Sequence, residues 1–367
     1  MSKKYRVAVI GRTNRGNYGH GLDTVWLDMD RAELVAVADE DEKGLKEATA
    51  RLGVKAGYSD YREMLRQERP QIVSVAPRWL DCHHDMVLAC AEYGASIFLE
   101  KPMCRTLAEA DAMVEACERS HVKLAIAHQT RYSPKIQVIK DLIAEGRLGR
   151  VLEFCGRGKE DRRGGGEDLW VLGTHIFDLM RIFGGNALWC YARVTQDGRP
   201  VTRADVVDGA EGIGALAGDR VEAMYGMENG AGAYFSSHRN AAGRPTRFGL
   251  TIRGSKGLLE MYTGSVPDVH LLEDSAWSPG RTGSKWMSVS TAGVGKPEPL
   301  EKGRAHQGNI WTCEDLIRAI EEDRDPIGSV YEARGATEMI VAAFESHRQG
   351  GPVKLPLENR ENPLLSL

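Results

Sequence analysis

The first third of the chain alternates between two kinds of segment, and this alternation limits the fold more than any other feature. Short runs that are apolar at nearly every position are typical of strands buried on both faces of a sheet. Such runs occur at residues 5–11, 33–39, 71–77 and 95–102. Helical patterns lie between them, at residues 41–53, 61–70 and 84–94. Strands and helices in alternation predict an α/β unit with a parallel sheet and right-handed crossovers.

The same pattern continues for a short distance. A helix is expected at residues 106–120, where Thr106 and Glu109 have the spacing of a capping box. A further strand is expected at residues 122–129, and a helix at residues 133–149. We therefore expect a dinucleotide-binding type of domain over residues 1–128.

After Val151 the pattern changes. Segments of mixed polarity, without a helix between each pair, favour a mainly antiparallel sheet in an α+β domain. These segments are residues 151–158, 187–195, 232–240 and 247–262. The second domain is expected to span residues 129–367. Its closing helices, at residues 309–326 and 331–350, could pack back on the first domain. Residues 263–306 are rich in Gly, Ser and Pro and predict a long surface excursion.

Composition excludes several classes of partner. A chain of 367 residues, 42% hydrophobic and 27% charged, can form two ordinary domains. The 48 basic and 52 acidic residues are mixed along the chain, so nucleic acid is not an expected partner. The first residues lack the apolar region of a leader peptide, and no run has the length of a membrane span. Seven scattered cysteines without a C-x-x-C pair predict reduced thiols in a cytoplasmic protein.

A glycine-rich stretch, "GRTNRGNYGHGLD" at residues 11–23, directly follows the first strand. In a dinucleotide-binding unit such glycines let backbone N–H groups approach the pyrophosphate, and the next helix presents its positive N-terminal end. Gly11 and Gly16 hold the first and third positions of G-x-G-x-x-G, whereas Thr13 holds the second. The stretch is either an ordinary glycine-rich turn or a rebuilt phosphate loop. In the second case Gly11, Thr13, Asn14 and Gly16 contact the cofactor.

The end of the second strand favours the cofactor interpretation. Asp39 lies 23 residues after Gly16, close to where a carboxylate accepts hydrogen bonds from the adenosine ribose. Glu40 and Asp41 follow, so a 2′-phosphate would be repelled and NAD is expected in preference to NADP. The alternative is a solvated acidic turn, which explains the charges but not their position at a strand end.

Glu100, Lys101 and Pro102 directly follow the fourth apolar run. Ligands bind at the carboxyl ends of the strands of a parallel sheet, so Lys101 is expected beside a nicotinamide ring. Glu100 is a candidate cofactor contact for the same reason. An isolated lysine is usually solvated surface, but a lysine at this position is a candidate site residue.

Several motifs make the chain resemble the Gfo/Idh/MocA oxidoreductases, which include glucose-fructose oxidoreductase and inositol dehydrogenases. The motifs are E-K-P, its spacing from His83 and Gly94, "HQTRYSP", "LIAEGRLGRV", "GTHIFD" and "FESHRQGGPVKLPL". The resemblance implies an N-terminal Rossmann domain and a C-terminal domain that binds the substrate and has a large open sheet for homodimer or homotetramer contacts. It also implies NAD(P)-linked oxidation or reduction of sugars, polyols or their derivatives.

The resemblance further implies that Lys101 lies at the nicotinamide and the substrate, and that a D-x-G-x-H motif supplies a catalytic His with an accompanying Asp. Gly173 and His175 match this motif, but Val171 stands at the Asp position. His175 can remove a hydroxyl proton while hydride leaves the same carbon, and Lys101 can stabilise the developing alkoxide. The alternative for His175 is a structural histidine at a helix start, packed between domains.

Nearby carboxylates could replace the missing Asp. Glu167 and Asp168 could supply one from the preceding loop, and Asp178, one helical turn after His175, could orient the imidazole. No metal is expected: "DCHHD" at residues 81–85 has the right residue types, but adjacent side chains diverge.

Further candidates are taken from the resemblance. Pro77 and His83 resemble a P-N-x-x-H segment at the cofactor, although Arg78 replaces the Asn and the spacing is longer. Arg131 and Tyr132 match a segment where the two domains meet and are candidates for cofactor or substrate contact. Each candidate sugar contact has the alternative of being ordinary surface or core. The candidate sugar contacts are Arg162, Arg163, Trp170, His238 and Arg239.

Three functions remain open from the sequence. The first is an NAD-dependent dehydrogenase that acts on a secondary hydroxyl of a sugar, polyol, inositol or glycoside. The second retains NAD and uses transient oxidation to cleave or rearrange a glycoside. The third is a non-catalytic dinucleotide-binding regulatory protein, and the presence of both Lys101 and His175 speaks against it.

Overall fold

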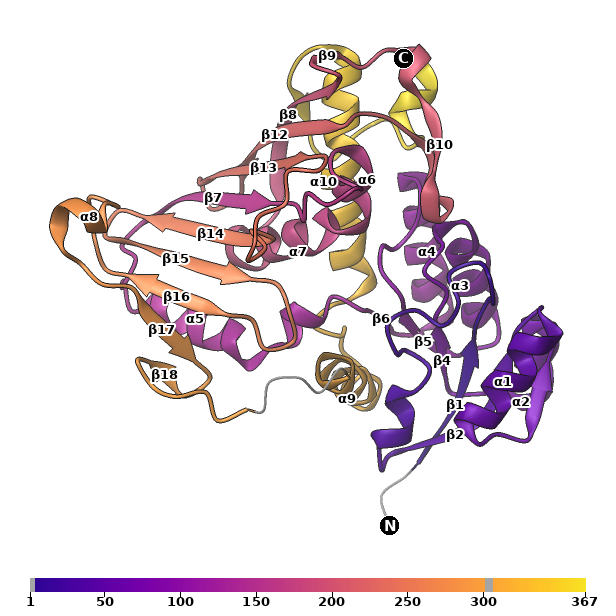
Figure 1. Cartoon of the computed structure of the whole chain (residues 1–367). Helices are drawn as coiled ribbons and strands as arrows, with labels where there is room; N and C mark the ends of the chain where they lie inside the picture. The colour runs from indigo at the N-terminus through magenta and orange to yellow at the C-terminus, as the bar shows by residue number, and fades with distance from the viewer. Residues whose placement is uncertain (1–3, 301–305) are drawn as a thin grey trace. The chain divides into compact units, whose positions relative to one another are not determined.

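The structure is a computed structural model that describes residues 4–300 and 306–367 (Figure 1). The described chain forms two compact units. The first comprises residues 4–128, 210–214 and 306–334, and the second comprises residues 129–209, 215–300 and 335–367. Two segments that follow residue 128 thus belong to the first unit.

The first unit is built on a six-stranded sheet in the order β3-β2-β1-β4-β5-β6, with all strands parallel. The strands are β1 (Tyr5–Ile10), β2 (Ala32–Ala38), β3 (Ala56–Tyr58), β4 (Ile72–Val75), β5 (Ser96–Leu99) and β6 (Leu124–Ile126). The predicted parallel sheet is confirmed, and the short strand β3 is an addition to it. The strand order reverses between β1 and β4, so their carboxyl ends form the crevice where ligands of such sheets bind.

Helices cover both faces of this sheet. They are α1 (Glu42–Leu52), α2 (Tyr61–Glu68), α3 (His83–Glu92), α4 (Leu107–Ser120) and α9 (Gln307–Glu322). Helices α2, α3 and α4 pack on one face, and α1 and α9 pack on the other. The predicted cap of α4 is present, because Thr106 Oγ1 accepts a hydrogen bond of 3.1 Å from the backbone N–H of Glu109.

The connection from β1 to β2 differs from the usual crossover. Residues 11–24 form a series of turns, followed by a single 3-10 turn, η1 (Val25–Asp28), and no α-helix is found in this described segment. Five residues of the loop have positive φ, which an α-helix does not tolerate. They are Asn14, Gly16, Asn17, Gly19 and Gly21. The loop is therefore not followed by an α-helix that could present its N-terminus to a phosphate.

The second unit is built on an eleven-stranded sheet. Its order is β18-β17-β16-β15-β14-β7-β13-β12-β8-β19, with β9 paired to β8. The central strands are β7 (Val151–Arg157), β8 (Ala187–Gln196), β12 (Arg220–Met227), β13 (Gly232–His238), β14 (Gly249–Gly254) and β15 (Gly257–Tyr262). The pair β7 and β13 is parallel, and the other neighbours run antiparallel. The expected large, mainly antiparallel sheet is confirmed.

The excursion predicted at residues 263–306 is partly wrong. The segment adds three strands to the edge of the large sheet, because apolar residues such as Val269, Leu271 and Val289 alternate there with polar ones and are buried. The elements are β16 (Val269–Leu272), α8 (Pro279–Thr282), β17 (Met287–Ser290) and β18 (Gly293–Val294). Residues 301–305 lie outside the described residues.

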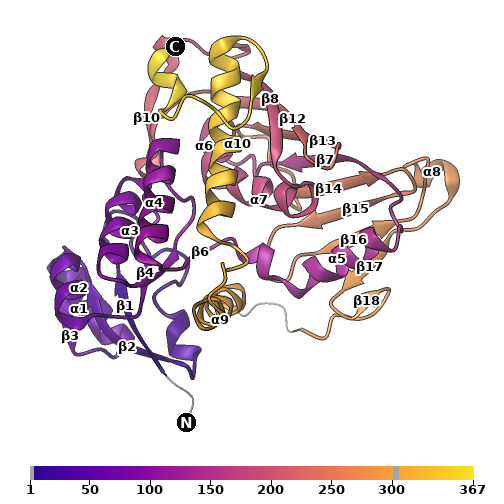
Figure 2. The same cartoon turned by 180° about the vertical axis from the view of Figure 1, so that it is seen from behind.

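The remaining elements complete the second unit. Its other α-helices are α5 (Pro134–Ala144), α6 (Gly166–Val171), α7 (Gly173–Gly184) and α10 (Val330–Gln349), which Figure 2 labels. Its 3-10 turns are η3 (Gln129–Tyr132), η4 (Arg203–Asp205) and η6 (Pro363–Ser366). The first turn of α10 is part of the first unit. The shorter strands are β9 (Arg199–Pro200), β10 (Val207–Gly209), β11 (Gly214–Leu216) and β19 (Val353–Lys354). Phe177 of α7 packs on Tyr225 and Phe235, with ring centroids 5.5 and 5.0 Å apart. In the described chain, no helix is both long and apolar enough to cross a bilayer.

Candidate functional site

Asp39, at the end of β2, is buried and holds the glycine loop. Only 2% of its surface is exposed. Its carboxylate accepts hydrogen bonds from Thr13 Oγ1 at 2.6 Å, Tyr18 Oη at 2.7 Å and Asp41 N at 3.0 Å. The backbone N–H of Thr13 lies 3.1 Å from both carboxylate oxygens. Thr13, at the unusual second position of the glycine motif, is thus a partner of Asp39.

The glycines of the loop allow close contacts within the protein. A Cβ on Gly11 would lie 2.1 Å from the ring of Tyr18, and a Cβ on Gly16 would lie 2.4 Å from the backbone nitrogen of Arg78. Asn14 has a φ of +66°, and its backbone N–H donates to Asn17 Oδ1. The close approaches at Gly11 and Gly16 are therefore made to side chain and backbone of the same unit.

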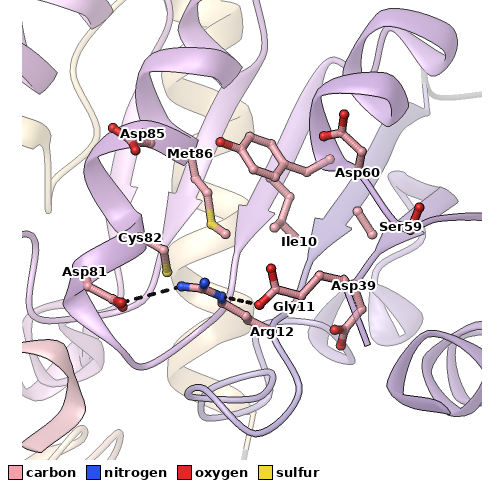
Figure 3. Close-up of a pocket in the computed structure, with 13 residues that line it drawn as sticks. Ile10, Gly11, Arg12, Asp39, Ser59, Asp60, Asp81, Cys82, Asp85 and Met86 are labelled. Atoms are coloured by element: carbon pink, nitrogen blue, oxygen red, sulfur yellow. Dashed lines mark hydrogen bonds and ion pairs between the residues drawn. The ribbon is translucent and has the colours of Figure 1, made fainter. Parts of the chain in front are cut away.

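A pocket of about 400 Å³ opens beside this loop, at the carboxyl ends of β1 and β2 (Figure 3). Five carboxylates and one guanidinium line it: Asp39, Glu40, Asp60, Asp81, Asp85 and Arg12. Arg12 Nε donates to Glu40 Oε1 at 2.7 Å, and Arg12 Nη1 lies 3.6 Å from Asp81 Oδ2. The pocket is therefore rich in hydrogen-bond acceptors and negative charge.

Lys101 follows β5 and is enclosed, with 6% of its surface exposed. The peptide bond between Lys101 and Pro102 is cis. The Lys101 ammonium lies 3.9 Å from Glu100 Oε1, and His20 Nδ1 lies 2.9 Å from the same oxygen. Glu100 also accepts a hydrogen bond from the backbone N–H of His20. The glycine loop and the E-K-P segment thus meet through His20 and Glu100.

His83 is fully buried and connects two loops at the same edge of the sheet. Its Nε2 lies 2.7 Å from the carbonyl oxygen of Pro77, after β4. Its Nδ1 lies 3.0 Å from the carbonyl oxygen of Pro102 and 3.1 Å from that of Met103. The structure therefore brings Pro77, His83 and the E-K-P segment together, with His83 as the link.

His175 is the third residue of α7 in the second unit and is half-buried. Its ring lies 6.4 Å from that of Phe248, in an edge-to-face arrangement. One turn further along α7, Asp178 Oδ1 accepts a hydrogen bond of 2.8 Å from Arg131 Nε, and both side chains are buried. Arg131 and Asp178, which the sequence analysis places in separate roles, are thus direct partners.

The carboxylates before His175 have different surroundings. Asp168 is fully buried and accepts hydrogen bonds from Ser237 Oγ and from the backbone N–H of Glu160. Burial raises the pKa of Asp168, and the hydrogen bond from Ser237 opposes this effect. Glu167 is half-buried, and Val171 is in the core with 2% of its surface exposed.

The candidate sugar contacts differ in how far their side chains are exposed to solvent. Trp170 has 1% of its surface exposed, so its ring belongs to the interior of the second unit. Arg163 Nη2 lies 2.7 Å from Asp161 Oδ2, and this hydrogen bond lowers the pKa of Asp161 to about 2. Arg162 and Arg239 are exposed, and His238 is half-buried.

Sequence reasoning missed three residues that contact Asp39, Glu40 and Glu100. Arg12, Tyr18 and His20 lie within the glycine-rich stretch, beside the predicted contacts Thr13 and Asn14. Their positions in that stretch are the signal that could have found them. In the described residues there is no group of three or more His, Cys, Asp or Glu that could hold a metal ion.

Comparisons with known proteins give the wider context. The chain is 34% identical over 155 residues to a D-apiose dehydrogenase of Paraburkholderia graminis, covering 42% of this chain and 40% of that protein. It is 28% identical over 256 residues to a levoglucosan dehydrogenase of Pseudarthrobacter phenanthrenivorans, covering 60% of this chain and 63% of that protein. Thus it spans less than two thirds of the length of these two relatives. A scyllo-inositol 2-dehydrogenase (NAD(+)) of Bacillus subtilis is 25% identical, with 98% of each chain covered.

Solved structures share the fold. Levoglucosan dehydrogenase in complex with NADH and levoglucosan superposes with a TM-score of 0.76 at 22% identity, covering 97% of this chain and 100% of that chain. Sequence models of one family match both parts of this chain. The NAD-binding Rossmann fold of the oxidoreductase family GFO_IDH_MocA matches residues 5–128, and the GFO/IDH/MocA C-terminal domain matches residues 136–260. With an NAD-binding Rossmann domain at its N-terminus, the chain belongs to the Gfo/Idh/MocA family of oxidoreductases.

Proposed function

We propose that the protein is an NAD-dependent dehydrogenase that oxidises a secondary hydroxyl of a sugar, a polyol such as inositol, or a glycoside. The observation that carries the proposal is the setting of Lys101. It is a nearly buried ammonium at the carboxyl end of β5, 3.9 Å from Glu100 Oε1 in a Rossmann unit. Dehydrogenases of D-apiose, levoglucosan and inositol among the relatives support the substrate class.

The residues at the end of the first sheet fit the dinucleotide. The pocket beside β1 and β2 has acceptors for ribose hydroxyls, and its five carboxylates outnumber its one guanidinium. A 2′-phosphate would enter a site of like charge, so the pocket favours NAD over NADP. Gly11, Thr13, Asn14, Gly16, Asp39, Pro77, His83, Glu100, Lys101 and Arg131 remain our proposed set of residues that bind or shape the NAD site.

When bound, NAD supplies the acceptor for the hydride. The protein's own part is to hold the hydroxyl and to take its proton. We assign proton removal to the His175 imidazole, which is half-buried and so accessible to a substrate. We assign stabilisation of the developing alkoxide to the Lys101 ammonium, because a cation shielded from water interacts strongly with an oxyanion.

Supporting roles are proposed for residues around His175. Asp178 fixes the Arg131 guanidinium, so these two residues form a buried charge pair beside the start of α7. Asp168 fixes the segment before α6 through Ser237 and Glu160. Glu167, Arg162, Arg163 and His238 remain candidates for substrate contact.

A panel of sugars, polyols, sugar acids and glycosides, assayed with NAD and with NADP for reduced cofactor, tests the function. Lys101→Met and His175→Ala are each expected to lower kcat about a hundredfold or more, while both variants remain folded at the assay temperature. Near-normal turnover in both folded variants would contradict the assigned roles. Glycoside cleavage without accumulation of NADH would instead favour the transient-oxidation mechanism.

We also propose that the protein acts in the cytoplasm as a homodimer or homotetramer. All seven cysteines are free thiols, and six of them are buried, which suits a reducing compartment. The oligomer is supported by aromatic side chains exposed on the large sheet, such as Tyr191 and Tyr234.

A further inference from the structure

We propose that Glu40, in place of Asp39, is the carboxylate that binds the adenosine ribose hydroxyls and discriminates against NADP. This inference rests on the proposed use of a nicotinamide dinucleotide. The sequence pattern indicates Asp39, but in the structure the Asp39 carboxylate is hydrogen-bonded within its own unit.

The acceptor capacity of Asp39 is already used by its own loop. A carboxylate offers about four lone-pair positions. Four donor groups point at Asp39: the N–H and Oγ1 of Thr13, the hydroxyl of Tyr18 and the N–H of Asp41. A ribose hydroxyl could bind only by displacing one of them, which would leave a buried donor without a partner.

Tyr18 holds this arrangement in place. Its ring packs against Gly11, and the Arg51 guanidinium lies over the ring, 4.6 Å from its centroid. Burial, with the hydrogen bond to Asp39, raises the pKa of Tyr18, so its hydroxyl remains a donor at neutral pH. Asp39 therefore stabilises the loop between β1 and β2, which contains no α-helix, by accepting hydrogen bonds from its residues.

Glu40 has the complementary properties. It lines the pocket, its side chain is 58% exposed, and Arg12 Nε holds one of its oxygens at 2.7 Å. In the described chain Glu40 Oε2 has no hydrogen-bond partner, so this oxygen can accept from a ligand hydroxyl. Arg12 is itself braced by Asp81, as Figure 3 shows, which gives Glu40 a fixed anchor.

Asp60, Asp81 and Asp85 also have one engaged oxygen each, but they lie in other segments of the chain, whereas Glu40 lies just after the end of β2, where the ribose of a dinucleotide is expected. Asp60 caps α2 by accepting from the backbone N–H of Arg62. Asp81 pairs with Arg15 at 2.7 Å, and Asp85 Oδ1 lies 2.8 Å from the ring of His84. Glu40 is thus the pocket carboxylate best placed to bind a diol, and its charge would repel a 2′-phosphate.

Titration of the full-length protein with NAD and NADP, followed by intrinsic fluorescence, tests the proposal without turnover. Glu40→Gln should weaken NAD binding about tenfold or more, because it removes a charge-assisted acceptor. It should also narrow the preference for NAD over NADP and leave the Tm unchanged. Glu42→Gln, a neighbouring exposed carboxylate outside the pocket, is the matched control and should change neither dinucleotide affinity.

Asp39→Asn tests the structural role that we assign to Asp39. It should lower the Tm by several degrees, and NAD affinity measured well below that Tm should change less than in Glu40→Gln. The assignment to Glu40 would be wrong if Glu40→Gln bound NAD with wild-type affinity, or if NAD affinity were lost only in folded Asp39→Asn. Either result would leave the proposed function standing. Wild-type protein that bound neither dinucleotide would overturn the proposed function and this assignment together.

Discussion

At the scale of residues, the surroundings of a carboxylate decide what it does. Glu100 is fully buried, yet its pKa is lowered. Burial, the largest single cause, would raise the pKa, but the hydrogen bonds and charge of His20 together with the charge of Lys101 lower it overall. The ionised form is therefore favoured in the folded protein and helps to fix the position of Lys101.

This shift predicts a pH-dependent stability. Because the pKa of Glu100 is lower in the folded than in the unfolded chain, its contribution is present above its ordinary value of 4.5 and is lost as the pH falls through the folded-state pKa. Glu100→Gln should lower the free energy of unfolding by about 1–3 kcal/mol near neutral pH, and the difference from wild type should shrink as the solution is acidified. Urea unfolding at several pH values measures it, with exposed Glu47→Gln as the control. A difference that grew on acidification would contradict the role.

At the scale of elements, the sequence predicted the parts that depend on local patterns. Strands β1, β2, β4 and β5 follow from continuous apolar runs, and Lys101 follows from its position after a strand. The partners of Asp39 and Glu100 did not follow. Tyr18 and His20 reach them across 21 and 80 residues of sequence, through a loop whose irregular turns have no periodicity. Long-range side-chain pairs of this kind depend on the assembled sheet.

The contact between Gly11 and Tyr18, in the connection from β1 to β2, leads to a second stability prediction. A Cβ at Gly11 would overlap the Tyr18 ring at 2.1 Å, so Gly11→Ala should displace Tyr18 and destabilise the protein by about 1–3 kcal/mol. Gly280→Ala is the matched control, because a Cβ there meets open space. Thermal and urea unfolding of both variants provide the measurement. Equal stability of the two variants would show that Tyr18 is not packed on Gly11.

At the scale of the whole molecule, the chain forms two units. The first contains Lys101 and the pocket that we propose for NAD, and the second contains His175 and the candidate substrate contacts. Helix α9 belongs to the first unit although it lies late in the sequence, and its Leu316 and Ile317 complete the core under Phe98. Each unit thus has its own core.

The large sheet of the second unit predicts self-association. Its inner-facing residues are covered by helices, whereas Tyr191 of β8 and Tyr234 of β13 flank Met224 of β12 on the opposite face and are 48% and 40% exposed. Burying these two tyrosines and Met224 against a second copy would remove apolar surface from water.

Light scattering of the wild-type protein should therefore give the mass of a dimer or tetramer. The double variant Tyr191→Glu, Tyr234→Glu should give a folded monomer, because two charges would have to be buried without partners. Lys43→Glu, an exposed change on α1 of the first unit, should leave the mass unchanged. A monomeric wild-type protein, or an unchanged mass in the double variant, would exclude this face as the interface.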